Sequence, residues 1–208
     1  MTKRRLAIAG ASALGRQLKG HAEATGLYDF VGFFDDFAGR AEDVIGKTRE
    51  IEEAFGGGAF DCLAIGVGYK AMSFRHEVMR RCAGRIPLAS VVHRSAVVDP
   101  DAVVGEGAVL LACAVLDQRV RLGRNCFLSL ASTISHDTII GDSTYISPKA
   151  TVCGNCKIGE RVFLGAGCVI RDGITICDDA VIGAGAVVVN DVVFPGVYAG
   201  NPARQLKG

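Results

Sequence analysis

The sequence predicts a small Rossmann-like α/β domain over residues 1–90, followed by an all-β parallel β-helix over residues 91–208. Short apolar segments alternate with helical ones in the first part, and glycine-rich turns lie between them, as in parallel α/β sheets. From Val92 to Val188 every sixth residue is Val, Leu or Ile, without exception. A period of six fits neither an α-helix nor a single amphipathic strand, and it indicates hexapeptide repeats.

In the first domain the apolar runs and turn residues predict eight elements. Thr48 is the expected N-cap of the second helix. Because the strands alternate with helices, the sheet should be parallel and should bind ligands beyond the carboxyl ends of its strands. In chain order we expect a strand at 5–9, a turn at 10–15, a helix at 16–25, a strand at 30–34, a helix at 49–55, a strand at 60–65, a helix at 70–82 and a strand at 86–92.

Three features should meet at that edge of the sheet. The turn Gly10–Gly15 and the helix after it offer backbone N–H groups to a phosphate. Asp35 and Asp36 offer acceptors to ribose hydroxyls, and Gly66 allows a close backbone approach. GxxxxG is not the GxGxxG fingerprint, so a plain turn without ligand remains an alternative. The functional interpretation is a pyrophosphate-bearing nucleotide, either a redox cofactor or a nucleotide sugar.

In the second domain three hexapeptides should close one triangular coil, so that residues 18 apart stack in nearly six coils. The large aliphatic residues point inward. The position two residues before each of them is mostly occupied by a small residue, and this set of positions, the small register, includes Cys126, Cys156 and Cys168. Glycine or aspartate after the aliphatic residue, as in Ile140-Gly141-Asp142, is expected where the chain bends. The Gly/Pro-rich tail 194–204 should fold back over the last coil.

His136 is the residue of the β-helix that the repeat does not explain. It lies at a corner, two residues after Ile134, and an acid, Asp137, follows it. Its neighbours 18 residues away are Gln118 and Gly154, so no side chain should crowd it on the glycine side. A corner histidine can be an ordinary solvated residue, but beside an acid it is the best general-base candidate in the chain.

Charge and composition argue against several other classes. The net charge is +1 and the pI is about 7.6, so neither a nucleic acid nor a membrane is expected as partner. The apolar run at 6–9 is too short for a secretory signal, and a cytoplasmic protein is expected. Cys153 and Cys156 form a CxxC, but the small register already explains Cys156, so no metal is expected.

The whole chain resembles the hexapeptide acyltransferases that act on nucleotide sugars. These include bacterial N-acetyltransferases of nucleotide-linked amino sugars and the related sialic acid O-acetyltransferases. The resemblance is carried by Gly10–Gly15, Phe33-Phe34-Asp35-Asp36, Ala64-Ile65-Gly66, Ile134-Ser135-His136-Asp137, Ile182-Gly183-Ala184-Gly185-Ala186 and Gly200-Asn201-Pro202-Ala203.

The resemblance implies a left-handed β-helix, a homotrimer with sites between subunits, acetyl-CoA as co-substrate and a role in bacterial surface-glycan biosynthesis. His136 would take a proton from the sugar amine as it attacks the thioester, and Asp137 would orient His136 or help to bind the amine. The tail Gly200–Ala203 would cover the CoA end. The implied nucleotide-sugar contacts are Gly10, Ser12, Ala13, Leu14, Asp35, Asp36 and Gly66, and the implied CoA contacts are Tyr145, Gly154, Ala166 and Ala184.

The sequence departs from the family pattern in two places. Ala13-Leu14 replaces a common Gly-His, and Tyr145 stands where some members carry a second histidine. Three alternatives remain beside the N-acetyltransferase. One is an O-acetyltransferase of the sialic acid type, and one is a non-catalytic nucleotide-sugar scaffold. The third is a carbonic-anhydrase-like metalloenzyme, which needs three histidines where this β-helix has only His93 and His136.

Overall fold

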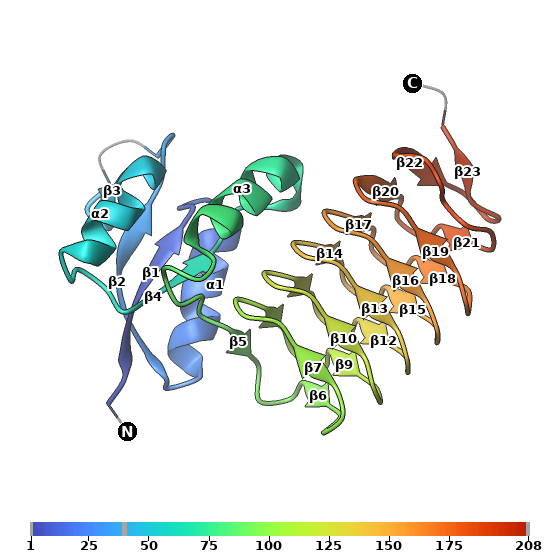
Figure 1. Ribbon diagram of the computed structural model, residues 1–208, viewed down its shortest axis with the longest axis horizontal. Coiled ribbons are helices and arrows are strands. Elements are labelled where there is room, and N and C mark those ends of the chain that lie inside the picture. The colour runs from blue at the N-terminus through green and yellow to red at the C-terminus, as the bar shows by residue number, and fades with distance from the viewer. Residues whose placement is uncertain (1, 39–40, 207–208) are drawn as a thin grey trace. The chain divides into compact units, whose positions relative to one another are not determined.

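The computed structural model describes residues 2–38 and 41–206, and it divides into two compact units, Met1–Val91 and Val92–Gly208. Figure 1 shows an α/β unit at the N-terminal end of the chain and a stack of coils at the other. Each unit is described below by itself.

The first unit is a four-stranded parallel sheet in the order β3-β2-β1-β4. Leu6–Ala9 of the central strand are wholly buried, which explains their apolar run. The predicted strands and helices at 5–9, 16–25, 30–34, 49–55, 60–65 and 70–82 are all present with small shifts. The elements are β1 (Arg4–Ala9), α1 (Ala13–Ala24), β2 (Tyr28–Phe34), β3 (Val44–Gly46), a 3-10 turn (Thr48–Glu50), α2 (Ile51–Gly56), β4 (Cys62–Ile65), a 3-10 turn (Tyr69–Ala71) and α3 (Met72–Cys82).

Three details of this unit differ from the prediction. The edge strand β3 has only three residues and was not expected. The strand predicted at 86–92 is present only in two pieces, a bridge between Leu88 and Leu63 and the two-residue strand β5 (Val91–Val92). Pro87 has no N–H with which to extend the ladder beside Leu63. Thr48 is not an N-cap: its hydroxyl donates to the carboxylate of Asp36. Lys47 holds the N-cap position, and its backbone N–H donates to the carboxylate of Glu50 at 2.9 Å.

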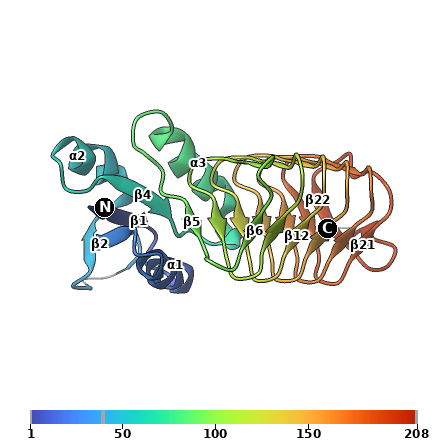
Figure 2. The ribbon, with the colours of Figure 1, turned by 90° about the horizontal axis from the view of Figure 1, so that it is seen from below.

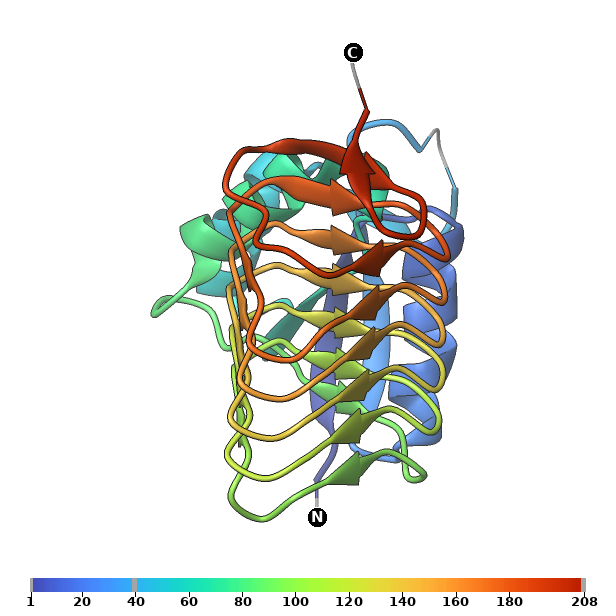
Figure 3. The same cartoon turned by 90° about the vertical axis from the view of Figure 1, so that its right-hand side faces the viewer.

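The second unit is a triangular parallel β-helix whose seventeen short strands, β5 to β21, follow one another every six residues (Figure 3). Residues 18 apart pair in register, as Phe127, Tyr145 and Phe163 do. The strands are β5 (Val91–Val92), β6 (Val97–Val98), β7 (Val103–Val104), β8 (Val109–Leu110), β9 (Val115–Leu116), β10 (Arg121–Leu122), β11 (Phe127–Leu128), β12 (Thr133–Ile134), β13 (Ile139–Ile140), β14 (Tyr145–Ile146), β15 (Thr151–Val152), β16 (Lys157–Ile158), β17 (Phe163–Leu164), β18 (Val169–Ile170), β19 (Thr175–Ile176), β20 (Ala180–Ile182) and β21 (Val187–Val188).

The strands form three faces, which Figure 2 shows from another side as a regular stack. Face 1 holds β6, β9, β12, β15, β18 and β21, and face 2 holds β7, β10, β13, β16 and β19. Face 3 holds β5, β8, β11, β14, β17 and β20, and it continues into the tail strands β22 (Gly196–Ala199) and β23 (Arg204–Gln205). The tail therefore covers the last coil, as predicted, with Ala203 N–H donating to Val187.

The interior is filled by the inward aliphatic register. From Leu110 to Val188 each of these side chains is at most 3% exposed, and each full burial contributes about 1.5–3 kcal/mol. The two threonines of the small register donate their hydroxyls to carbonyls of the next coil: Thr138 donates to Cys153 O at 3.0 Å, and Thr144 donates to Gly159 O at 2.8 Å.

The bend at each corner lies elsewhere than predicted. Every sixth residue from Gly107 to Gly185 has a positive φ, and it stands three positions after the inward aliphatic residue, not one. Asp137, with φ 57°, is one of them, and aspartate tolerates this conformation better than most residues. Gly141 has an ordinary φ. A Cβ there would lie 2.5 Å from the backbone of Gly159, so close stacking of the coils requires its glycine.

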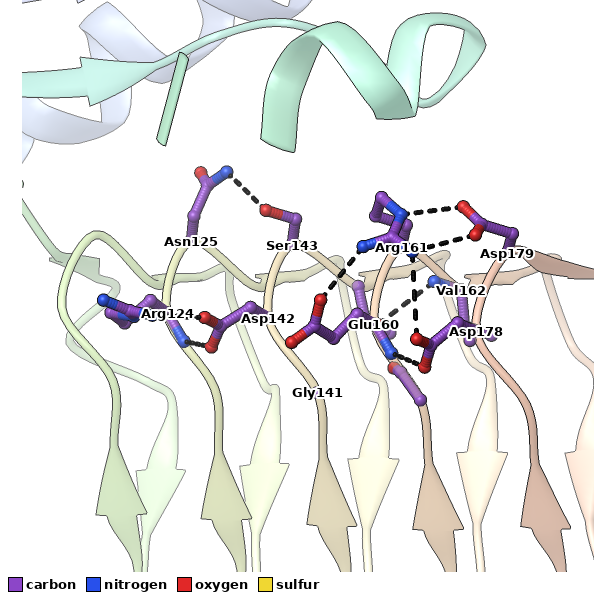
Figure 4. Close-up of polar contacts among 12 residues, drawn as sticks. Arg124, Asn125, Gly141, Asp142, Ser143, Glu160, Arg161, Val162, Asp178 and Asp179 are labelled. Atoms are coloured by element: carbon purple, nitrogen blue, oxygen red, sulfur yellow. Dashed lines mark hydrogen bonds and ion pairs between the residues drawn. The ribbon is translucent and has the colours of Figure 1, made fainter. Parts of the chain in front are cut away.

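One corner of the β-helix carries a ladder of charged side chains (Figure 4). Arg124 pairs with Asp142 of the next coil at 2.8 Å, and Arg161 pairs with Asp179 at 2.8 Å and with Glu160 at 2.9 Å. At least one partner of each pair lies in solvent, and exposed ion pairs contribute about 0–1 kcal/mol each. The ladder therefore fixes the stacking register of the coils more than it stabilises the fold. Of the helices in residues 2–38 and 41–206, none has the length and apolar character needed to cross a bilayer.

Candidate functional site

A pocket of about 560 Å³ opens at the carboxyl ends of the strands of the first unit. Six of the seven predicted nucleotide-sugar contacts line it. Gly66 does not line it but supports it, because a Cβ there would lie 2.5 Å from Gly15 Cα. The lining residues are Gly10, Ser12, Ala13, Leu14, Asp35, Asp36, Phe37, Thr48, Val67, Gly68, Tyr69, Lys70, Ala71 and Phe74.

One wall of this pocket is the start of α1. Ser12 is the N-cap, but its side chain makes no capping hydrogen bond, and Arg16 N–H makes the first bond of the helix, to Ser12 O. The N–H groups of the first turn have no partners within the helix, and the helix dipole is positive there. Such an N-terminus binds phosphate groups well.

The two aspartates hold the rim of the pocket. Asp35 accepts hydrogen bonds from Ala11 N–H at 2.7 Å, Phe37 N–H at 2.7 Å and Ala38 N–H at 2.6 Å. Burial alone acts to raise the pKa of Asp35, but these donors and Lys47 outweigh it and lower the pKa. Asp36 accepts from Thr48 N–H at 3.1 Å. The carboxylates expected to receive ribose hydroxyls are thus already engaged in fixing three loops.

Two aromatic residues at the rim were missed by the sequence prediction. Phe37 follows β2 and is 94% exposed, and Tyr69 follows β4 and is 46% exposed. Both line the pocket, and flat exposed rings suit stacking on a nucleobase. An aromatic residue soon after a strand that ends at a ligand edge is a signal the sequence does contain.

On the β-helix, His136 lies at the corner between β12 and β13. Its Nδ1 is 2.9 Å from Asp137 Oδ2, and Arg119 of the previous coil donates to both oxygens of Asp137, at 2.7 and 2.8 Å. The guanidinium of Arg119, helped by His136, holds the pKa of Asp137 well below its ordinary value. Asp137 is therefore an anion that accepts the Nδ1 proton, which leaves the lone pair of His136 on Nε2. This is the arrangement of an oriented general base.

The free edge of the imidazole lies over Gly154. A Cβ at that position would stand 2.7 Å from both Cε1 and Nε2 of His136. The φ of Gly154 is ordinary, so its glycine is required by this space and not by the backbone. The sequence prediction correctly left this side of His136 open, but it overlooked Asp172, whose Oδ1 lies 2.9 Å from the same point.

The predicted CoA contacts lie on different parts of the β-helix. Gly154 shares the corner of His136. Ala166 and Ala184 are exposed one above the other at the corner between faces 3 and 1. Tyr145 lies on face 3, is only 9% exposed and stacks on Phe127, with the ring centroids 4.6 Å apart. A single chain thus places these four positions on two corners and one face.

The CxxC residues Cys153 and Cys156 lie on either side of Gly154, at the corner of His136. Cys156 is buried, donates to Arg171 O at 3.2 Å, and burial raises the pKa of its thiol. Cys153 is half-buried. Within residues 2–38 and 41–206 no three histidine, cysteine or acidic residues are placed to hold a metal ion together.

Comparison with known proteins identifies the family. The model of the bacterial transferase hexapeptide (six repeats) matches residues 137–172 and 155–190. A search of curated protein sequences finds no significant match. The acetyltransferase domain of PglB from Neisseria gonorrhoeae FA1090 is 32% identical, with a TM-score of 0.89 over 98% of this chain and 100% of that one. The chain belongs to the hexapeptide-repeat sugar acetyltransferases.

Other structures of these acetyltransferases match over nearly the full length. The PglB domain in complex with acetyl coenzyme A is 32% identical over 99% of this chain and 100% of its own, with a TM-score of 0.87. PerB from Caulobacter crescentus, in complex with CoA and GDP-perosamine, shares the fold at 24% identity over 97% of each chain, with a TM-score of 0.89. The predicted fold class, a Rossmann-like α/β domain followed by a left-handed parallel β-helix, is confirmed.

Proposed function

We propose that this protein is an acetyl-CoA-dependent N-acetyltransferase that acts on the amino group of a nucleotide-linked amino sugar. The observation that carries the proposal is the chain of contacts Arg119–Asp137–His136, in which Nε2 of His136 lies 2.7 Å from the point where a side chain of Gly154 would begin. The side chain of His136 is 48% exposed, which leaves room for an acceptor to approach the ring.

In the proposed reaction the amine nitrogen attacks the thioester carbonyl carbon of acetyl-CoA. A C–N bond forms, and His136 Nε2 takes the proton that the nitrogen loses. The C–S bond then breaks, the CoA thiolate leaves, and it takes a proton back from the imidazolium. The products are the amide and CoA with a free thiol. The charge of Asp137 stabilises the imidazolium between the two proton transfers, as the low pKa of that carboxyl supports.

The pocket of the first unit is proposed to hold the nucleotide. The start of α1 suits the pyrophosphate, and Phe37 and Tyr69 suit the base. The bound GDP-perosamine named for PerB supports a nucleotide amino sugar as the substrate class. Ala13 and Leu14 at this wall are apolar. We therefore expect the nucleotide sugar to be bound here by backbone N–H groups and not by a polar side chain.

We further propose a homotrimer in which each acetyl-transfer site lies between two subunits. His136 and the pair Ala166 and Ala184 lie on the two corners that border face 1. The outward side chains of face 1 are small and β-branched, and Val97 is 58% exposed. If face 1 packs against a neighbouring subunit, the His136 corner of one subunit comes to lie beside the Ala166 and Ala184 corner of the next. Such a head-to-tail contact, repeated three times, closes a ring.

An acceptor panel tests the proposed function. The purified protein is incubated with acetyl-CoA and with UDP-, GDP- or dTDP-linked amino sugars, or with sialic acid, and the products are identified by mass. Transfer to one of the amino sugars is expected. Transfer to sialic acid alone would favour the O-acetyltransferase, and binding without any transfer would favour a scaffold. Light scattering should give three times the chain mass of 21.8 kDa.

A further inference from the structure

Asp172 differs from the acids of the β-helix that are paired with arginine. Asp137, Asp142 and Asp179 each pair with an arginine of a neighbouring coil. Asp172 is exposed and makes no hydrogen bond or ion pair within the residues that the structure describes. It lies at the corner of His136, two coils later, and Gly154 lies between them. Its carboxylate is therefore without an ion-pair partner in the part of the chain that the structure describes, beside the base that the proposed mechanism uses.

His136 and Asp172 face the same point from opposite sides. His136 Nε2 lies 2.7 Å, and Asp172 Oδ1 lies 2.9 Å, from the position of the missing Cβ of Gly154. The two atoms are thus less than two hydrogen-bond lengths apart. A nitrogen that lies near both atoms, on the solvent side of Gly154, could donate one N–H to Nε2 and another to the carboxylate.

We propose that Asp172 binds the acceptor amine and makes this site selective for an amine over a hydroxyl. An ammonium or amine nitrogen carries at least two hydrogens and can serve both acceptors, whereas a hydroxyl carries one. The carboxylate also attracts the cationic form of the amine, and it holds the nitrogen in place while His136 removes a proton. This inference rests on the proposed function, whose acceptor specificity it refines.

The test compares the wild-type protein with Asp172→Asn, which has the same shape but no charge. The substrate pair is the nucleotide amino sugar found in the panel and its analogue with a hydroxyl in place of the amine. KM for the amine should rise about tenfold, the size expected of one exposed charge-assisted hydrogen bond, while kcat changes less than about threefold. The preference for amine over hydroxyl should fall by the same factor.

Glu106→Gln is the matched control, because it removes one exposed negative charge at a different corner. It should leave KM and the acceptor preference unchanged. Equal melting temperatures would show that both variants are folded. Unchanged KM and preference in Asp172→Asn would overturn the inference.

Binding measured by calorimetry separates the inference from the proposed function. Wild-type protein should bind the amine-bearing nucleotide sugar about tenfold more tightly than the hydroxyl analogue, and Asp172→Asn should lose that difference. This comparison needs no turnover. If wild-type protein transfers no acetyl group, the proposed function fails, and the binding difference still decides the role of Asp172.

Discussion

Replacing Gly154 by alanine would fill the space beneath the proposed base. The added methyl carbon would stand 2.7 Å from Cε1 and Nε2 of His136, whereas comfortable contacts begin near 3.5 Å, so the ring must retreat by about 0.8 Å. That movement strains its 2.9 Å contact with Asp137 and moves Nε2 from the acceptor. A misplacement of about 1 Å can cost about 100-fold in rate, and we expect kcat/KM to fall about 30- to 100-fold.

The same substitution should not damage the fold. Since the φ of Gly154 is ordinary, alanine is tolerated by the backbone and restricts the unfolded chain, an effect worth about 0.4–1 kcal/mol in favour of folding. The melting temperature should stay equal or rise by about 2 °C. Loss of activity without loss of stability is the signature of a site residue.

The assay measures initial rates of CoA formation by chromatography, because the exposed Cys113 would react with thiol-specific dyes. Gly20→Ala is the control: a Cβ at this position in α1 meets no atom within 4 Å, so activity should be unchanged and stability should rise by about 1 kcal/mol. If Gly154→Ala keeps the wild-type kcat/KM, the space over Gly154 is not part of the reaction site.

Three further predictions concern the two units. Asp137→Asn keeps the size of the side chain and its tolerance of positive φ but removes the anion behind His136. At saturating substrate kcat should fall about 100-fold with the fold intact, and a wild-type kcat would show that Asp137 does not position the base. Ile146→Ala should lower the free energy of unfolding in urea by about 3 kcal/mol, because Ile146 is wholly buried, and a loss below about 1 kcal/mol would contradict a close-packed interior. Folding lowers the pKa of Asp35, so the Asp35 carboxylate stabilises the fold fully above its unfolded pKa of about 3.9, and this stabilisation is lost as the pH falls below that value. Between pH 5 and pH 2 the melting temperature of Asp35→Asn should therefore fall less than that of the wild type.

Much of the fold could be predicted because the hexapeptide period assigns every residue of the β-helix to a face or a corner. The inward register, the strand pairing 18 residues apart and the number of coils all follow from it. The period could not show which corner residue takes the positive φ. That residue is often not glycine, and the conspicuous glycines, such as Gly141, serve the close stacking of the coils instead. The strand β3 was missed because three residues are too few to show a pattern.

The candidate site was predictable only in part. His136 and Asp137 stood out because the repeat does not explain them. Asp172 lies at the same corner as His136, two coils later. The period shows that residues 136, 154 and 172 stack, but it does not show that the side chains of His136 and Asp172 both point toward Gly154. The roles of Asp35 and Asp36 were also hidden, since counting their hydrogen-bond donors requires the folded loops.

The central claim is that His136 removes the proton from the acceptor amine, and His136→Ala tests it most directly. His136 is 48% exposed, so the variant should fold with an unchanged melting temperature. With saturating acetyl-CoA and nucleotide amino sugar at neutral pH, kcat should fall by about 100- to 10,000-fold, the range that a general base contributes. A variant that acetylates the amine at the wild-type rate would contradict the account.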